Sequence, residues 1–472
     1  MGRSKTKERR SGTSNKRIKI RKRRISIKDK MMRKHIINTL SVFLISTTFY
    51  AQEVLSKQKA FELTMANNFD IKVIKNNLAI AENNKSIYNS GYLPSITGNV
   101  GARYTNNDTD IEFQDGTLNS VAGAESENYN ASIGLNYVIF NGFSRQNTFK
   151  RLKESYNLSE LQARQVMENT IITLFIAYYE VGRLTENEIT QKAALTISKK
   201  RLERAKYGFD YGQRTKLDVL NAEVDVNNDS ISYIDIQRQL NNAKRDLNVV
   251  LGRDVNTAVM VDTNVLYDLK MNLADISKEA RNKNANLLQS KKNIELSKLD
   301  VKINQAGWMP NVGLTSSYAW NRNTGDATNA FSPISNTQTG LSAGVNLTWN
   351  LFDGGRTRTN VKNAKIAVAN QEIRKAQLQD QLDRDVNNAW ETYQNRLFAL
   401  KAQEQNVITS TLNFERSNER FKLGQISSID FRQAQVNLIN AELSRNNAKF
   451  VAKNAELQLL QLAGIILDHN NF

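Results

Sequence analysis

One stretch of the chain has the pattern of a very long, uninterrupted helix. Arg356 to Leu423 is 68 residues without Gly or Pro, rich in Ala, Gln, Arg, Lys and Leu, which favour helix. At about 1.5 Å per residue it would extend roughly 100 Å. Phe352-Asp353-Gly354 precedes the stretch, and Phe421-Lys422-Leu423-Gly424 follows its last turn with a glycine able to end a helix. The pattern predicts a long helix at about 356–422.

The same signals occur 212 residues earlier in the chain. The matching positions are Phe140-Asn141-Gly142 for the entry, Phe209-Asp210-Tyr211-Gly212 for the end, Asp218 for Asp430, and Gly252 for Gly464. A second long helix is therefore predicted at about 143–207. Two copies of one pattern predict a duplicated unit. We expect a first repeat at 52–252 and a second at 272–464, with a linker or equatorial segment at 253–271 and a C-terminal tail at 465–472.

Each repeat also predicts a pair of shorter helices, near 53–90 and 272–306. Asn67-Asn68 and Asn284 lie where each pair could be broken. Pro94 and Pro310 then mark the change from helix to strand.

Alternation with a period of two follows each of these prolines. The expected strands are 94–105, 129–140, 310–320 and 340–350, with polar loops at 105–128 and 321–338. One face of the strands carries mainly apolar residues: Ile96, Gly98, Val100, Ala102, Tyr104, Ile133, Leu135, Tyr137, Ile139, Val312, Leu314, Ser316, Tyr318, Trp320, Leu341, Ala343, Val345, Leu347 and Trp349. A strand of about ten residues suits a tilted crossing of a bilayer.

Three tryptophans lie at predicted strand ends: Trp308, Trp320 and Trp349. Indole combines an apolar body with a polar N–H, so these positions suit the two interfaces of a membrane. A soluble hairpin packed on a core explains the alternation equally well. The tryptophans and the secretory signal described below favour the membrane.

The helix-rich regions carry a seven-residue repeat of apolar positions. In the last helix these are Ile429, Val436, Leu443, Phe450 and Leu457, and in the first repeat they are Leu217, Val224 and Ile231. A strict period of seven makes helices wrap around one another. The other faces are too polar for a solid four-helix core, so one wall should face water. An ordinary coiled coil is an equally good explanation of this periodicity.

The positive charge of the chain is concentrated at its start. Residues 1–34 hold 16 Lys/Arg and two acids, or +14 of the total +18, which leaves +4 for the rest. Segment 1–30 is interpreted as a disordered or non-native extension, although a basic run can bind nucleic acid. Residues 31–51 resemble a secretory signal peptide, with an uncharged apolar run after Arg33-Lys34. A simple anchor helix is the alternative.

The sequence offers no candidate catalytic, cofactor or metal site. It contains no Cys and only two His, His35 and His469. No Cys–His pair, zinc motif or phosphate-binding glycine loop is present. We therefore expect no enzyme and no cofactor.

Taken in order, these motifs resemble the TolC-like outer-membrane efflux family, also called outer membrane factors, over residues 53–464. The resemblance implies a mixed α/β membrane protein with a tandem-repeat α-helical barrel of long coiled-coil helices. It implies a homotrimer in the outer membrane, in which four strands per protomer form a 12-stranded barrel and the helices form a tunnel in the periplasm. It further implies a passive efflux duct for small molecules that works with a periplasmic adaptor protein and an inner-membrane transporter, in contact with outer-membrane lipid and without nucleic acid.

Two alternatives stay open from the sequence. One is the outer component of a type I protein secretion system. The other is a trimeric coiled-coil adhesin or scaffold without a pore, which the strand pair midway along each half disfavours.

The resemblance also implies a periplasmic gate at the helix tips. Gly212 and Gly424 occupy the two turns, Asp218 matches the gate aspartate of the first repeat, and Asp430 matches the first of two aspartates that ring the pore in the second repeat. At each of these positions a helix cap or a solvated charge is the competing explanation.

Four positions depart from the family's gate pattern. Gln433 stands at the second pore aspartate, Ile426 at an arginine position, and Phe421 at the gate tyrosine. Arg214 lies in the first repeat at the offset where the family's arginine occurs in the second. The salt bridges of the gate must therefore differ here.

Overall fold

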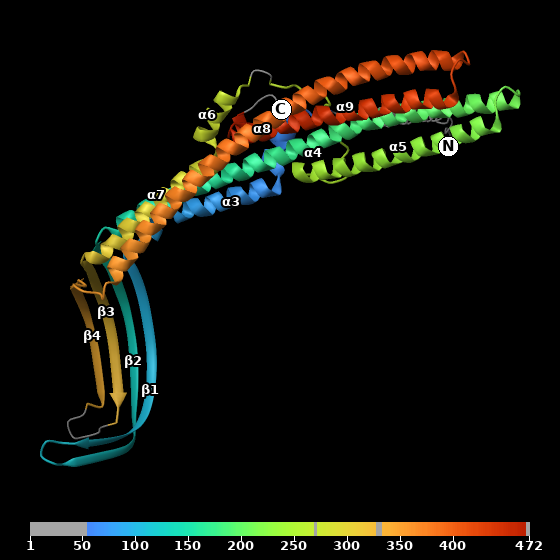
Figure 1. Ribbon diagram of the computed structural model, residues 1–472. Coiled ribbons are helices and arrows are strands. Elements are labelled where there is room, and N and C mark those ends of the chain that lie inside the picture. The colour runs from blue at the N-terminus through green and yellow to red at the C-terminus, as the bar shows by residue number, and fades with distance from the viewer. Residues whose placement is uncertain (1–53, 269–270, 327–332, 469–472) are drawn as a thin grey trace, which may run out of the picture. The chain divides into compact units, whose positions relative to one another are not determined.

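The computed structural model describes residues 54–268, 271–326 and 333–468 (Figure 1). The basic extension expected at 1–30 and the signal peptide expected at 31–51 lie outside these residues. Among the described residues, Val54, Leu55 and 258–260 belong to a small unit in which the Leu55 N–H donates to the Met260 carbonyl at 2.8 Å. All other described residues form one larger unit. Nearly all described residues of the two expected repeats lie within this larger unit.

Four long helices dominate the larger unit, and they occur in two antiparallel pairs (Figure 1). They are α4 (Ser144–Asp210), α5 (Lys216–Leu251), α8 (Arg356–Lys422) and α9 (Ser428–Leu462). The helices α4 and α8 each contain 67 residues, which corresponds to roughly 100 Å.

The shorter helices also come in pairs, one pair in each half of the chain. These are α2 (Lys57–Asn67) with α3 (Phe69–Asn84), and α6 (Leu273–Lys283) with α7 (Ala285–Gln305); three 3₁₀ turns are η1 (Ile87–Asn89), η2 (Ala306–Trp308) and η3 (Ile466–Asp468). Asn68 and Asn284 each end one helix and begin the next, as their positions predicted. Their side-chain amides also donate to the Val250 and Leu462 carbonyls, at 2.8 and 3.0 Å. Each asparagine thus ties its helix pair to the end of a long helix.

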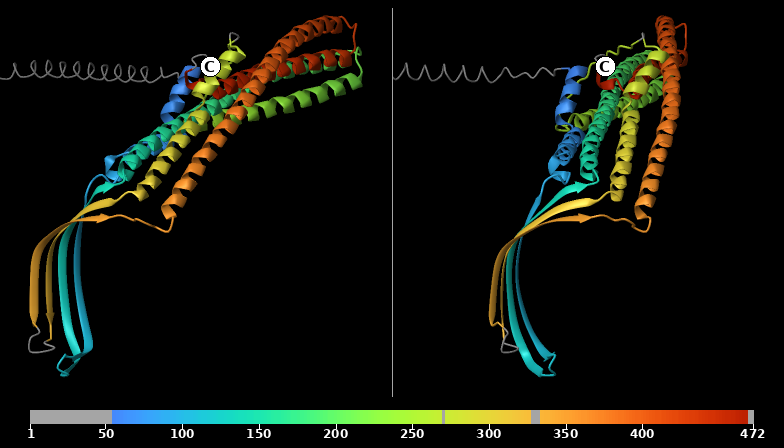
Figure 2. Two further views of the ribbon diagram at one scale, coloured as in Figure 1. Left: turned by 60° about the vertical axis from the view of Figure 1, so that its left-hand side comes forward. Right: turned by 90° about the vertical axis from the view of Figure 1, so that its left-hand side faces the viewer.

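The strands form one antiparallel sheet with the order β1-β2-β3-β4 (Figure 2). Their bounds are β1 (Ser95–Glu112), β2 (Leu118–Asn141), β3 (Asn311–Gly325) and β4 (Ser335–Thr348). The polar loop expected at 105–128 is wrong, because both strands continue to a short turn in which the Phe113 N–H donates to the Thr117 carbonyl at 2.9 Å. Backbone ladder bonds hold strands together whether or not their side chains alternate in polarity, so polarity alone underestimated the strand length.

The register places the predicted apolar positions of all four strands on one face. Val100 is paired with Ala131, Ala131 with Trp320, and Leu314 with both Tyr137 and Val345. Only Ile139 falls at a register shift, between Val138 and Phe140. The opposite face is lined by Asn, Ser, Thr and Gly, with Arg103 as its single charged residue over the regular part of the register. In one chain the apolar face is uncovered, since Val100, Leu341 and Val345 are 88%, 74% and 65% exposed.

The helices that lead into the sheet follow the same order as the strands. The packing neighbours are α3 with α4, α4 with α7, and α7 with α8 (Figure 2). A row of four helices thus continues a row of four strands. Neither row closes on itself among the residues that the structure describes.

The core lies between the helices and contains few residues for a chain of this length. One cluster of buried side chains joins α6, α7, α8 and α9 around Leu382, Val386, Tyr393 and Leu459. A second group of aromatic rings packs edge-to-face or tilted between α4 and α9: Phe175, Tyr178, Tyr179 and Phe450.

Part of the expected seven-residue seam is not buried within the chain. Leu217, Val224, Ile231 and Ile429 are 65%, 56%, 67% and 70% exposed, whereas Phe450 and Leu457 are buried. A heptad pattern indicates that a helix wraps around another, but it does not say which chain supplies the partner.

The segment between the halves is held by buried polar groups of the long helices. Lys453 and Glu456 of α9 form a fully buried ion pair at 2.8 Å. The Lys453 ammonium also donates to the Leu266 carbonyl at 2.9 Å, and the Tyr393 hydroxyl of α8 donates to the Asp268 carbonyl at 3.2 Å. The residues from 261 to 268 are therefore bound to both helices of the second pair.

Candidate functional site

Two helical hairpins end in matching turns, one between α4 and α5 and the other between α8 and α9. Gly212 and Gly424 adopt φ of +73° and +72°, the left-handed conformation that side chains disfavour. The Gln213 and Gln425 N–H groups donate back to the Gly208 and Arg420 carbonyls, at 2.6 and 2.8 Å. These bonds satisfy carbonyls that would otherwise be unpaired at the helix ends.

Asp218 and Asp430 begin the returning helices with the same capping geometry. The Asp218 N–H donates to the Thr215 hydroxyl at 3.2 Å, and the Thr215 N–H donates to the Asp218 carboxylate at 3.0 Å. The corresponding distances for Asp430 and Ser427 are 3.1 and 3.3 Å. Both aspartates therefore cap helices. The hydrogen bonds from the Thr215 backbone and side chain lower the pKa of Asp218 below its usual value.

The two tips are connected by Arg214 and Phe421. The Arg214 guanidinium lies 5.3 Å from the centre of the Phe421 ring, a cation–π distance. Phe421 is 7% exposed and stacks on Phe431 with ring centres 4.8 Å apart and planes 6° apart. Phe421 thus belongs to the packed core of the tip. This chain therefore joins its two hairpins through an aromatic face and a charge.

Gln433 lies one turn beyond Asp430 on α9 and does not reach the Arg214–Phe421 contact. Its amide donates to the Asn437 side chain at 2.8 Å, and both Asp430 and Gln433 are exposed. Of the predicted site residues, Arg214 and Phe421 thus join the two hairpins. Asp218 and Asp430 cap the returning helices, and Gln433 lies on the first turns of α9.

A buried polar cluster next to the tips was missed by the sequence analysis. Arg432 of α9 donates to both carboxylate oxygens of Asp229 on α5, at 2.7 and 2.8 Å, and lies 3.4 Å from Asp225. Ser198 of α4 donates to Asp229, and Gln435 accepts from Arg432 at 3.2 Å. The cluster joins α4 and α5 of the first half to α9 of the second.

A second arginine completes the cluster's balance of charge. Arg201 of α4 forms an ion pair with Asp225 and is 5% exposed. Burial lowers the pKa of Arg201 to about 10, and the nearby charge of Arg432 acts in the same direction. Two arginines and two aspartates thus pair inside the helix bundle. The sequence contained one indication of this cluster. Asp229 lies seven residues after Ala222, on the face of α5 that packs inward.

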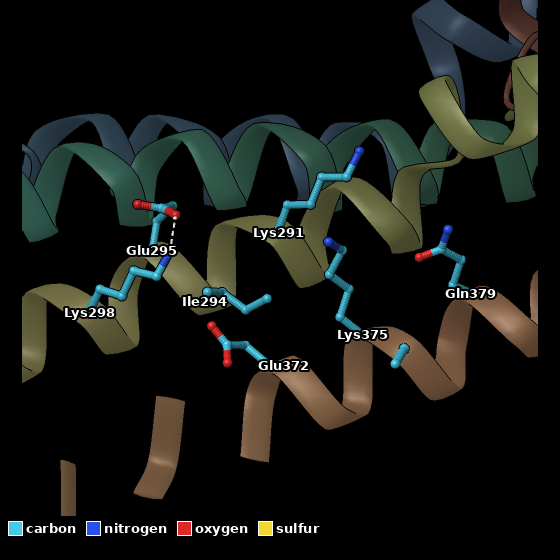
Figure 3. A pocket seen from close by; sticks show the side chains of 8 residues that line it. Lys291, Ile294, Glu295, Lys298, Glu372, Lys375 and Gln379 are labelled. Carbon is cyan, nitrogen blue, oxygen red and sulfur yellow. Dashed lines mark hydrogen bonds and ion pairs between the residues drawn. The ribbon is translucent and has the colours of Figure 1, made fainter. Parts of the chain in front are cut away.

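A charged groove also lies between α7 and α8 (Figure 3). It has a volume of about 350 Å³ and is lined by charged side chains that include Lys291, Lys375, Glu295 and Glu372. The groove is open, and Lys298 and Glu295 pair with each other at 3.2 Å along its edge. Among the described residues, its lining contains Lys and Glu but no Ser, Thr, Cys or His side chain.

The described residues lack both a cluster of metal-ligating side chains and a membrane-spanning helix. No group of three or more His, Cys, Asp or Glu side chains there is placed to hold a metal ion. None of the helices among those residues combines the length and the apolar character needed to cross a membrane.

Several known proteins resemble this chain in sequence over most of its length. The sequence profile of the family described as "Outer membrane efflux protein" matches residues 60–253 and 276–465. The outer membrane efflux protein BepC of Brucella suis is 21% identical over 431 residues, which cover 90% of this chain and 89% of that protein. The outer membrane protein TolC of Vibrio cholerae is 24% identical over 331 residues, covering 67% and 74%.

Solved structures share the fold. The Campylobacter jejuni CmeC outer membrane channel superposes with a TM-score of 0.72 at 18% identity, covering 87% of this chain and 86% of that one. CusC gives a TM-score of 0.71 at 12% identity, covering 87% and 92%. The profile spans most of the chain and both hairpins carry the expected turns, so this chain belongs to the outer membrane efflux protein family and is an outer-membrane channel protein with a periplasmic helical region.

Proposed function

We propose that three copies of this chain form one continuous export duct. The observation that carries the proposal is the open four-stranded sheet. Its edge strands β1 and β4 have no further neighbour among the described residues, and one face is apolar and exposed. Unpaired strand edges are not tolerated in lipid, so the edges must pair with other copies. Three copies would close a barrel of twelve strands with the apolar face towards lipid and the Asn/Ser/Thr face towards the lumen.

The helices support the same assembly. The row α3-α4-α7-α8 is open on both sides, and the uncovered heptad positions Leu217, Val224, Ile231 and Ile429 supply apolar surface for neighbouring copies. A ring of twelve helices would continue the lumen into the periplasm. We propose that the duct carries small molecules passively, catalyses no reaction, and is connected to an inner-membrane transporter through a periplasmic adaptor protein.

The helix tips would close this duct at the end away from the membrane. Each turn is 72 residues from the strand exit (212 − 140 and 424 − 352), a distance of roughly 100 Å along a helix. Three copies of Asp430 around one axis would form an acidic ring that attracts cations. Arg214 on Phe421, together with Arg432 on Asp229, would hold the second hairpin against the first and keep the duct narrow.

Single-channel recordings of trimers in planar bilayers test the gate. Asp430→Asn removes the charge but leaves a side-chain oxygen for the helix cap, so we expect less block by multivalent cations and unchanged assembly. Arg214→Gln should instead raise the resting conductance. Unchanged cation block and selectivity in Asp430→Asn would mean that Asp430 acts only as a cap.

Cysteine labelling tests the orientation of the sheet, because the natural chain contains no cysteine. Asn346 and Val345 are neighbours on opposite faces of β4. In reconstituted trimers a water-soluble thiol reagent should label Asn346→Cys rapidly and Val345→Cys slowly. The reverse order would contradict the proposed barrel.

A further inference from the structure

The junction between sheet and long helices has an unusual distribution of charge. The first ten residues of α4 and of α8 contain no acid and four basic residues each: Arg145, Lys150, Arg151 and Lys153, then Arg356, Arg358, Lys362 and Lys365. The positive end of a helix dipole favours acids, and α3, α5, α6 and α9 do carry Asp in their first turns. Helices α2, α4, α7 and α8 lack such an acid. At α8, however, the Asp353 carboxylate just before the helix accepts from the Thr357 N–H at 2.8 Å, whereas α4 has Arg145 as its second residue and no carboxylate in its first turn.

Arg145 is the most informative member of this set because it is buried. It is 7% exposed, and its Nη2 donates to the Ile139 carbonyl at 2.8 Å. Its guanidinium carbon lies 5.1 and 5.6 Å from the ring centres of Tyr92 and Tyr137. The Nε and Nη1 atoms have no hydrogen-bond partner, and Arg145 has no ion-pair partner in the described part of the chain. A buried guanidinium with unused donors is costly unless an anion completes it.

The position of Arg145 relative to the apolar face suggests the source of that anion. Tyr137 is opposite Leu314 on the apolar face of the sheet. Trp308 and Trp349 are 51% and 54% exposed near the strand ends, and the Trp349 indole donates to the Trp308 carbonyl at 3.1 Å. Exposed tryptophans at the end of an apolar face mark the level of lipid head groups. Arg145 therefore lies close to the level of lipid phosphates.

We propose that Arg145 binds the phosphate group of an anionic phospholipid in the leaflet facing the periplasm. This inference rests on the proposed placement of the sheet in the membrane. Tyr92 is half-buried, so a turn of its side chain opens the guanidinium to a head group. Two phosphate oxygens then accept hydrogen bonds from Nε and Nη1 of Arg145, which have no other partner in the described residues.

Native mass spectrometry and thermal unfolding of delipidated, full-length trimers test the site. We compare dioleoylphosphatidylglycerol, dioleoylphosphatidylcholine and inorganic phosphate as ligands. The wild-type trimer should retain phosphatidylglycerol in preference to phosphatidylcholine. Arg145→Gln should weaken phosphatidylglycerol binding about tenfold or more, since charge-assisted hydrogen bonds are lost, and Arg145→Lys should lose less. Arg384→Gln is the matched control, because Arg384 is an exposed arginine of α8 outside the first ten residues and paired with Asp385.

Three results would overturn the proposal. They are equal binding of phosphatidylglycerol by wild type and Arg145→Gln, equal retention of the two lipids by wild type, and equal protection by inorganic phosphate, which would indicate a free-phosphate site. If Arg145→Gln does not assemble, the lipid preference of wild type and its reduction in Arg145→Lys decide the question. A trimer without lipid preference refutes only this site, whereas the absence of any trimer refutes the proposed duct.

Discussion

Arg432 joins the buried Asp229 and the partly exposed Asp225 between three helices, so its removal leaves negative charge without a sufficient partner. We expect Arg432→Met to destabilise the protein by about 3–5 kcal/mol, because breaking one side of a buried ion pair strands the other. The resting conductance should rise, since α9 is no longer held on α5. Thermal unfolding and single-channel recordings measure the two effects. Arg384→Met, which breaks an exposed pair, should cost less than about 1 kcal/mol; equal effects of the two variants would contradict this role.

Asp218 makes a pH-dependent contribution to the first tip. Its folded pKa lies below the usual value of 3.8 because Thr215 donates two hydrogen bonds to the carboxylate. The stabilisation is therefore fully present above pH 3.8 and is lost as the pH falls through the lower, folded pKa. We expect wild type to lose stability faster than Asp218→Asn between pH 4 and pH 2. Parallel unfolding curves of the two proteins over this range would refute the contribution of Asp218.

At the scale of elements, the glycines that end the long helices divide into two kinds. Gly212 and Gly424 have open space where a Cβ would lie, so alanine there adds only backbone strain, about 1 kcal/mol. At Gly252 and Gly464 a Cβ would meet a backbone oxygen of Asn67 or Lys283, at 2.4 and 2.5 Å. Alanine at those two positions must push the short helix pairs away from the long helices.

The expected order of stability follows from this difference. Gly252→Ala and Gly464→Ala should lower the thermal midpoint and the yield of assembled protein clearly more than Gly212→Ala and Gly424→Ala. All four residues share a left-handed φ, so the tip variants control for backbone strain. Similar losses at all four positions would show that strain, and not the close approach, determines the cost.

At the scale of the whole molecule, the open sheet predicts that no folded monomer is stable. Mass measurement in mild detergent should give three chains per particle, because β1 and β4 need neighbours and four strands cannot close a barrel. Chemical cross-links between copies should involve these two strands. A stable, strand-rich monomer would contradict the architecture.

Local patterns were sufficient for the long helices, the breaks between the short helices and the apolar face of the sheet, but not for the full length of the strands. The absence of Gly and Pro over Arg356–Leu423 predicted α8, the period of two predicted the apolar face of the sheet, and Asn68 and Asn284 predicted breaks that the structure contains. These features depend on interactions between residues close in sequence. The repeated motifs, taken in their order along the chain, predicted the family. The repeat boundaries, the acidic ring of Asp430 and the role of Gln433 stay predictions.

Only the tertiary structure decided the contacts between distant segments. Arg432 reaches Asp229 across 203 residues, and Arg214 meets Phe421 across the two halves, although neither pairing has a local signal. The strands extend beyond the alternating residues because ladder hydrogen bonds need a neighbouring backbone and not an apolar side chain. The period of seven predicted helices that wrap around one another. The fold showed which of these apolar positions stay exposed to solvent in one chain. Sequence determines such pairings only through the folded arrangement of all its helices, which no single segment encodes.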